Sequence, residues 1–217
     1  MTKKTSVSPA SLLTLVSALV MGGLDAYGIL AHNGSVVTAQ TGNLVNIGLN
    51  LAQGEFRALP NHLALLLGFA AGCILPVFIV KSLVKTKNLW VLWTIFTVVV
   101  WIRVLLGASL SIFVSLVLLS FIAGMALSFF REMRTSNLNN GIMTGNLKNM
   151  YAALVEAMVY KQKQKYPEAF HLLLVIICFF CGSFIGGLLA KVSLFVTLLA
   201  CGIICLCPYG LLLVRRK

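Results

Sequence analysis

Long apolar stretches limit what this chain can fold into more than any other feature. Of its 217 residues, 59% are apolar and only 10% are charged, and the mean hydropathy is +0.98. Soluble domains usually carry about a quarter charged residues. A helix needs roughly 20 residues to cross a bilayer, and apolar stretches near that length lie at 11–31, 61–81, 88–106, 109–130, 169–190 and 192–214. The sequence therefore predicts an all-α polytopic membrane protein, folded as a single membrane domain over 1–217.

The net charge of +12 is better explained by membrane topology than by nucleic-acid binding. The Lys and Arg residues form short clusters between apolar stretches, without the basic face that nucleic acid requires. The six cysteines fall in predicted spans and lack metal-ligand spacing, so we expect no metal and no cofactor. No hydrolase, metalloprotease or nucleotide-binding motif is present, and we expect no catalytic residues and no enzymatic activity.

Two further segments, 36–53 and 138–159, are helix-like but too polar for ordinary lipid-facing spans. Either both cross, which gives eight crossings, or each enters and returns on the same side as a re-entrant segment. With re-entrant segments and a cytoplasmic amino terminus, thirteen Lys and Arg residues are cytoplasmic and three face outward, whereas eight crossings give ten and six. The positive-inside rule therefore favours six crossing helices plus two polar re-entrant or broken segments, with both termini cytoplasmic.

An internal repeat accompanies these polar segments. The sequences TGNLVN at 41–46 and TGNLKN at 144–149 agree at five of six positions, and each follows one apolar span and precedes two more. We expect two repeats, over 11–106 and 109–214. Because each repeat crosses three times under the favoured topology, the second would be inverted relative to the first, as in many transporters.

The repeated sequence supplies the candidate site residues. Glycine lets another backbone or a ligand approach closely, and Thr and Asn side chains can satisfy freed backbone groups. One interpretation is that both copies meet near the midplane and bind solute; the other, of nearly equal weight, is that the Asn side chains only hydrogen-bond between helices. The candidates are Thr41, Gly42, Asn43, Asn46, Thr144, Gly145, Asn146 and Asn149.

Asp25 is the only acidic residue deep within a predicted span, where a charge is costly, so it is a further site candidate. It could bind a cation, carry a coupling proton, or pair with Arg103. The alternative is a structural carboxyl that stays protonated or accepts from Tyr27 or from a backbone amide of a polar segment. Close helix packing, within the chain or in a homodimer, is the role expected of Gly68, Gly72, Gly182 and Gly186.

Three segments resemble the YoaK-like family of bacterial membrane proteins, long catalogued as a domain of unknown function. They are GLDAY at 23–27, TAQTGNL at 38–44 and MTGNL at 143–147. The resemblance covers nearly the whole chain and implies a multi-pass protein of the bacterial inner or plasma membrane, sometimes suspected of transport. The chain departs from the family pattern after Gly124-Met125, where Ala126-Leu127 replaces a polar pair.

The functional expectation is a small-solute transporter or permease in the bacterial inner membrane, coupled to a proton or an ion. Its central site would combine the two Thr-Gly-Asn segments with Asp25. The competing hypothesis is a membrane scaffold or regulator whose polar repeats serve only helix packing. A continuous hydrated cavity lined by both motifs would favour transport, and a dry interface would favour scaffolding.

Overall fold

The computed structural model describes residues 8–32, 34–83, 89–133, 136–137 and 143–215 and is built almost entirely of helices. Five helices are long and apolar enough to cross a membrane, and in the last helix, α8, the apolar part covers Leu194–Gly210. The long helices are α1 (Pro9–Ala31), α3 (Leu59–Leu83), α4 (Leu89–Leu106), α5 (Ile112–Phe129), α7 (Tyr166–Ala190) and α8 (Leu194–Arg215). The predicted all-α polytopic membrane fold is confirmed.

The two polar segments form short helices, α2 (Gln40–Gln53) and α6 (Met143–Met158). With 14 and 16 residues, they are about 21 and 24 Å long, less than the roughly 30 Å of a hydrocarbon core. The remaining elements are 3-10 turns at Gly107–Ser109 (η1) and Lys163–Lys165 (η2), and an antiparallel pair, β1 (Glu132–Met133) and β2 (Ser136–Asn137).

Local sequence explains where several helices begin and end. The Ser8 hydroxyl accepts a hydrogen bond from the Ser11 amide and Pro9 occupies the first turn of α1, while Ser111 caps α5 in the same way through the Val114 amide. Gly54 ends α2 with a φ of 71°, a left-handed conformation that glycine adopts without strain.

Each half of the chain packs mainly on the other half. Helix α1 contacts α7 and α8, and correspondingly α5 contacts α3 and α4; α2 lies on α3, and α6 lies on α7. If α1 to α4 are matched with α5 to α8, every one of these contacts has its counterpart. The pattern favours the two predicted repeats.

Glycines make the two closest helix crossings. At the α1–α7 crossing, a Cβ atom on Gly22 would overlap the backbone of Phe179, and one on Gly182 would overlap the backbone of Leu19. Gly186 lies one turn farther along α7, against Gly23.

At the α3–α5 crossing, Gly72 faces the backbone of Phe121 and Gly124 faces that of Phe69 in the same reciprocal manner, and Gly68 lies against Val117. The four predicted packing glycines, two on α3 and two on α7, thus lie against helices of their own chain.

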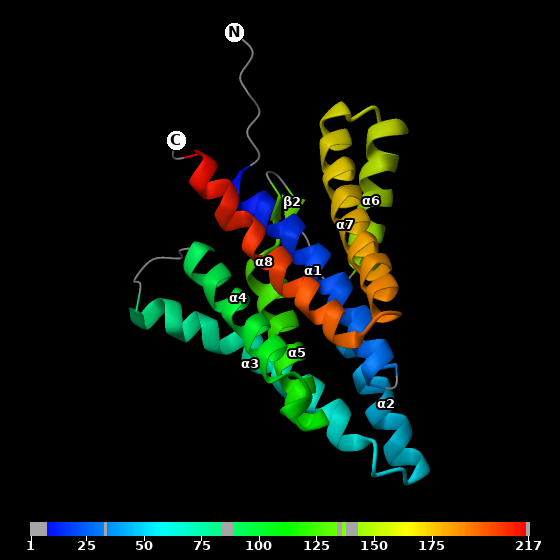
Figure 1. Ribbon diagram of the computed structural model, residues 1–217. Coiled ribbons are helices and arrows are strands. Elements are labelled where there is room, and N and C mark those ends of the chain that lie inside the picture. The colour runs from blue at the N-terminus through cyan, green and yellow to red at the C-terminus, as the bar shows by residue number, and fades with distance from the viewer. Residues whose placement is uncertain (1–7, 33, 84–88, 134–135, 138–142, 216–217) are drawn as a thin grey trace.

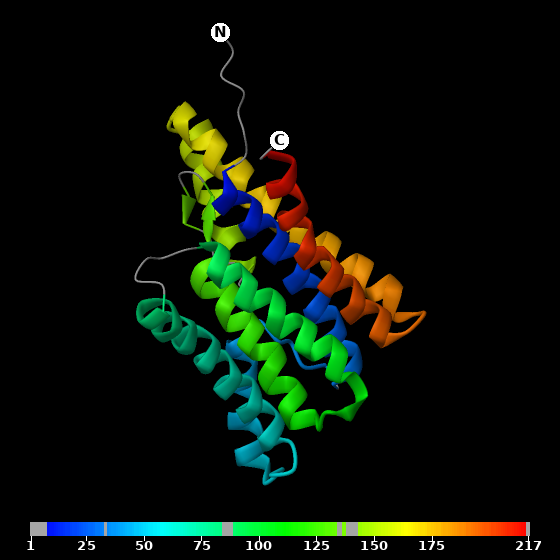
Figure 2. The ribbon, with the colours of Figure 1, turned by 60° about the vertical axis from the view of Figure 1, so that its left-hand side comes forward.

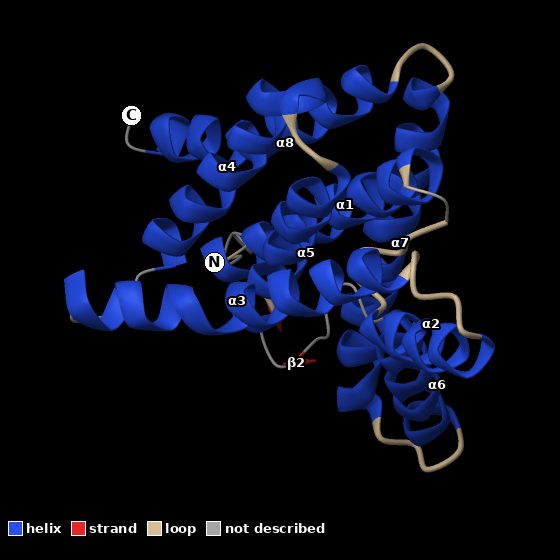
Figure 3. Ribbon diagram, turned by 90° about the horizontal axis from the view of Figure 1, so that it is seen from below, coloured by secondary structure: helices blue, strands red, loops and turns tan. Residues whose placement is uncertain are grey.

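The short helices lie at opposite ends of the bundle. In Figures 1 and 2, α2 runs down to the turn that starts α3, whereas α6 runs up to the turn that starts α7. Seen from below, both lie on the same side of the bundle (Figure 3). Their amino-terminal ends, which carry the Thr-Gly-Asn sequences, therefore point toward each other, an arrangement that favours inverted repeats.

The main apolar core lies among α1, α4, α5 and α8. Three fully buried aromatic side chains from α4 and the end of α5 form its centre: Trp93 and Phe96 stack with ring centroids 5.0 Å apart, and Phe130 meets both edge-on. Trp93 Nε1 donates to the Cys205 carbonyl on α8 at 3.1 Å, so the polar edge of this ring is satisfied.

Candidate functional site

Asp25 holds the loop that leads into α2. Its side chain lies on α1 and is only 4% exposed. Oδ1 accepts the Thr38 amide at 3.0 Å and Oδ2 accepts the Thr38 hydroxyl at 2.5 Å. Gly28 lies against Ser35 and Val37 of the same loop, with no room for a Cβ atom. After α1 ends, the chain therefore folds back along the last turns of α1 before α2 begins.

A chain of hydrogen bonds continues from this loop into the neighbouring helices. Gln40 Nε2 donates to the Val37 carbonyl at 2.8 Å and to Ser120 Oγ of α5 at 3.2 Å. The Ser120 hydroxyl in turn donates to the Leu65 carbonyl of α3. Asn43 Nδ2 donates to Gln40 Oε1 at 3.1 Å. The start of α2 is thus anchored to three long helices, and we call Asp25, Thr38, Gln40, Asn43 and Ser120 the entry network.

Among the candidate residues of the first Thr-Gly-Asn sequence, only Asn43 is buried, at 3% exposure; Thr41, Gly42 and Asn46 are exposed. Helix α2 packs on the bundle through a single narrow stripe. The entry network is therefore formed by one Asn of the repeat together with Asp25 and by Thr38, Gln40 and Ser120, which were not among the candidates. Thr38 and Gln40 stand directly before the repeated sequence, and this position was the sequence signal that could have identified them as site residues.

In the second repeat Asn146 is likewise buried, at 0% exposure, while Thr144 and Asn149 are exposed and Gly145 is half-buried. Asn146 Nδ2 lies 3.8 Å from the Met143 sulfur. The surrounding cluster is apolar, with Met150 of α6 packed with Leu172 and Val175 of α7. The equivalent Asn is therefore buried in both halves, but in different surroundings.

A second polar cluster, which sequence analysis missed, forms around Arg103 of α4. Arg103, which we expected on the outer side of the membrane, is buried within the bundle at 3% exposure. Nη2 donates to the Tyr27 hydroxyl at 2.5 Å, Nη1 lies 3.4 Å from the Gly107 carbonyl, and the guanidinium carbon lies 5.2 Å from the centroid of the Tyr27 ring. His32 Nε2 lies 3.0 Å from Ser115 Oγ and 5.8 Å separates the His32 and Tyr27 rings. Burial and the nearby Arg103 charge lower the pKa of His32.

Asp25 is not paired with Arg103, which was one of its expected roles. In the described part of the chain, the only ion pairs join Lys165 to Glu156 and to Glu168. The partner of Asp25 is instead Thr38, in the loop before α2, which donates both its amide and its hydroxyl to the carboxylate. Arg103 is the single charge in the long apolar stretch from α4 to α5, and sequence analysis considered it only as a possible partner of Asp25.

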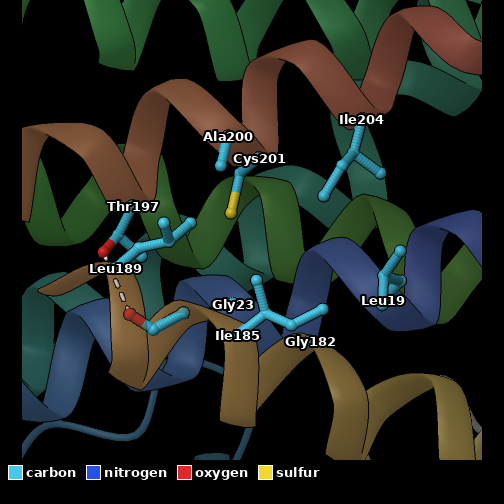
Figure 4. A pocket seen from close by; sticks show the side chains of 10 residues that line it. Leu19, Gly23, Gly182, Ile185, Leu189, Thr197, Ala200, Cys201 and Ile204 are labelled. Carbon is cyan, nitrogen blue, oxygen red and sulfur yellow. Dashed lines mark hydrogen bonds between the residues drawn. The ribbon is translucent and has the colours of Figure 1, made fainter.

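Two described pockets are apolar. One lies among α1, α7 and α8 and is lined by Leu19, Ile185 and Ile204 (Figure 4). The Thr197 hydroxyl, which also faces it, donates a hydrogen bond to the Gly186 carbonyl at 3.1 Å. This cavity has a volume of about 10 Å³, room for about one water molecule. The other is an open groove of about 340 Å³ between α6 and α7, lined by Met150, Leu154, Tyr166, Ala169, Phe170 and Leu173. Neither is lined by Asp25 or by the candidate residues of the two Thr-Gly-Asn sequences.

No group of three His, Cys, Asp or Glu side chains suited to a metal ion occurs within the described residues. The two polar clusters can bind protons or small ions. Asp25 is an acid and Arg103 is a permanent cation, and the groups around them are hydroxyls and amides.

Comparison with known proteins places the chain in a family but assigns it no activity. No curated protein and no solved structure matches it. A family model described as "Protein of unknown function (DUF1275)" matches residues 13–211, nearly the whole chain. The chain therefore belongs to this family of proteins of unknown function.

Proposed function

We propose that the protein is a small-solute permease of the bacterial inner membrane, with both termini cytoplasmic. One observation carries the proposal: the only acid buried in a spanning helix, Asp25, binds the loop that leads into a short re-entrant helix. Ionisable residues inside membrane helices mark solute or proton paths more often than packing sites. A proton arriving at Asp25 would weaken its two bonds to Thr38 and release the loop.

The two short helices support the same proposal. Their amino ends point toward each other from opposite ends of the bundle (Figure 1), and each buries its Asn at the first turn, Asn43 in α2 and Asn146 in α6. Broken or re-entrant helices in inverted repeats form the solute sites of many secondary transporters. We assign no enzymatic activity to the protein, and Asp25 serves as a proton carrier rather than a catalytic acid.

A scaffold or regulatory function is the second candidate, favoured by a specific observation. The two described pockets are apolar, and Asp25 and Asn43 have hydrogen-bond partners within the chain. A dry network of this kind could serve only to hold α2 in place.

Transport can be tested by comparing metabolite uptake and efflux of a deletion strain with strains that express the wild type or Asp25→Asn. For any solute that responds, uptake into proteoliposomes is then measured with and without an imposed proton gradient. We expect Asp25→Asn to insert normally and lose the response to the gradient, and the matched control Glu55→Gln, an exposed acid in the α2–α3 turn, to retain it. An Asp25→Asn protein with unchanged proton dependence would remove Asp25 from the coupling.

A further inference from the structure

Arg103 is a buried cation without an acidic partner. The chain contains five acidic residues. Two of them, Glu156 and Glu168, bind Lys165, and Asp25 binds Thr38. The other two, Glu55 and Glu132, are exposed. None of the five forms an ion pair with Arg103, although all are described. Burying a charge without a counter-charge costs several kcal/mol in general.

The neighbours of Arg103 compensate its charge only in part. The Gly107 carbonyl at the end of α4 and the face of the Tyr27 ring both offer partial negative charge. However, Nη1 is 3.4 Å from that carbonyl, a long hydrogen bond. Nε is fully buried and has no hydrogen-bond partner, so one charged donor of the guanidinium is unsatisfied.

The other polar groups of the cluster are also hydrogen-bond donors. The Tyr27 oxygen accepts from Arg103, which leaves its own proton free to be donated. His32 and Ser115 share one hydrogen bond, and in either tautomer of the neutral imidazole one proton of the pair is left for a third group: that of the Ser115 hydroxyl if Nε2 donates, or that of His32 Nδ1 if Ser115 donates. A site that combines a cation, an unused charged donor and further N–H and O–H donors is suited to an anion.

We propose that the cluster of Arg103, Tyr27, His32 and Ser115 binds a small monovalent inorganic anion such as chloride. A small ion fits best because the unsatisfied charged donor is a single buried N–H, that of Nε, and neither described pocket lies here. The cluster is at the carboxyl end of α1, beside the turn between α4 and α5, and His32 is only half-buried. The ion would enter past His32 from the surrounding water. This inference does not depend on the permease function, because an anion could bind here in a scaffold as well.

The test uses the full chain purified in detergent and chloride as the probe. Melting temperatures are compared in potassium chloride and potassium gluconate of equal ionic strength, and chloride binding is followed by the broadening of the ³⁵Cl resonance. We expect chloride to raise the melting temperature of the wild type and the broadening to saturate. Arg103→Gln should lose both effects, whereas Arg57→Gln, which changes an exposed arginine, should retain both.

Tyr27→Phe provides a second variant in case Arg103→Gln does not fold. Loss of the hydroxyl donor should weaken chloride binding by about tenfold, the effect of one hydrogen bond to a charged group. A wild type that melts at the same temperature in both salts without ³⁵Cl broadening would overturn the proposal. So would a folded Arg103→Gln protein with undiminished chloride binding, or a Tyr27→Phe protein with wild-type affinity.

Discussion

Helices α2 and α6 carry nearly the same sequence at their amino ends but begin in different surroundings. The loop before α2 is bound to a buried carboxylate, and α2 itself is anchored through Gln40 to α5. The amino end of α6 is packed among methionine and leucine side chains, with Asn146 as its buried polar residue. Within the described residues, buried hydrogen bonds therefore lead into the first short helix, whereas apolar side chains make up the cluster around the start of the second.

The helix crossings of the two halves, in contrast, are alike. Reciprocal glycines bring α1 against α7 and α3 against α5. On each of these four helices, the glycine stands three residues after the residue whose backbone the glycine of the facing helix contacts. In α1 the residue after Gly23-Leu24 is Asp25, whereas in α5 Gly124 is followed by Met125, Ala126 and Leu127. The backbone contacts are thus shared, while the buried acid Asp25 and the buried cation Arg103 both belong to the first half.

The largest effects should come from the crossings and should be equal in the two halves. Gly182→Val and Gly72→Val would each drive a side chain into a neighbouring backbone, and we expect a loss of about 4 kcal/mol or more of unfolding free energy, enough to prevent folding. Gly187→Val is the control, because Gly187 lies on α7 with open space at its Cβ position. The measurement is the yield of monodisperse protein and its melting temperature in detergent. If only one of the two crossings proves sensitive, the halves are not packed alike.

Intermediate effects should appear at the loop before α2. Thr38→Val removes the hydroxyl bond to Asp25, and we expect a loss of about 1.5 to 3 kcal/mol because the acceptor is a buried acid. Thr41→Val makes the same chemical change at an exposed position three residues later and should change stability by no more than about 0.5 kcal/mol. Thermal unfolding of both variants in the same detergent compares them. Equal effects would show that the Asp25–Thr38 bonds do not hold the loop.

A smaller effect is expected at Ser120, the contact between the entry network and α5. Ser120→Ala removes the bonds to Gln40 and to the Leu65 carbonyl, and we expect a loss of about 1 kcal/mol. Ser128→Ala on the same helix is the control. Protection of the α2 amides from hydrogen exchange provides a local readout, which should fall in Ser120→Ala and stay unchanged in the control. Loss of protection confined to other helices would contradict the anchoring role of Ser120.

The long helices could be predicted from sequence because their length and composition follow directly from the bilayer. The predicted span at 88–106, for example, is observed as Leu89–Leu106. The glycine contacts were partly predictable, since small residues four apart allow close helix packing in membranes. The helix that each glycine contacts could not be predicted, because the spacing of the glycines shows which face of their own helix is small but not which other helix packs against that face.

The candidate site was harder to predict. Sequence singled out Asp25 and the repeated Asn residues, but residue type does not reveal which side of a short helix faces the bundle, and Thr41, Gly42 and Asn46 turned out to be exposed. Arg103 was placed on the outer side of the membrane by the charge count and was considered only as a possible partner of Asp25. The bonds to Tyr27 and Gly107, which turn it inward, depend on how α1 and α4 pack.

The smallest effect should be at the far end of α6, where the second half uses surface charges. Lys165 binds Glu156 of α6 at 3.1 Å and Glu168 of α7 at 3.0 Å. The hydrogen bonds to Glu168 and then Glu156 raise the pKa of Lys165, so its contribution is complete below its ordinary pKa of 10.5 and is lost as the pH rises through the higher folded value.

Lys165→Gln should therefore lower the melting temperature only slightly. The difference from wild type should vanish in about 1 M salt, where the Debye length is about 3 Å. Lys163→Gln, which changes an exposed lysine two residues earlier in the same turn, is the control and should melt like the wild type at every salt concentration. The Thr38→Val effect, in contrast, should persist in high salt because its bonds are buried. A salt-resistant Lys165→Gln effect as large as that of Thr38→Val would mean that the two short helices are held equally firmly, and would contradict the contrast between the halves.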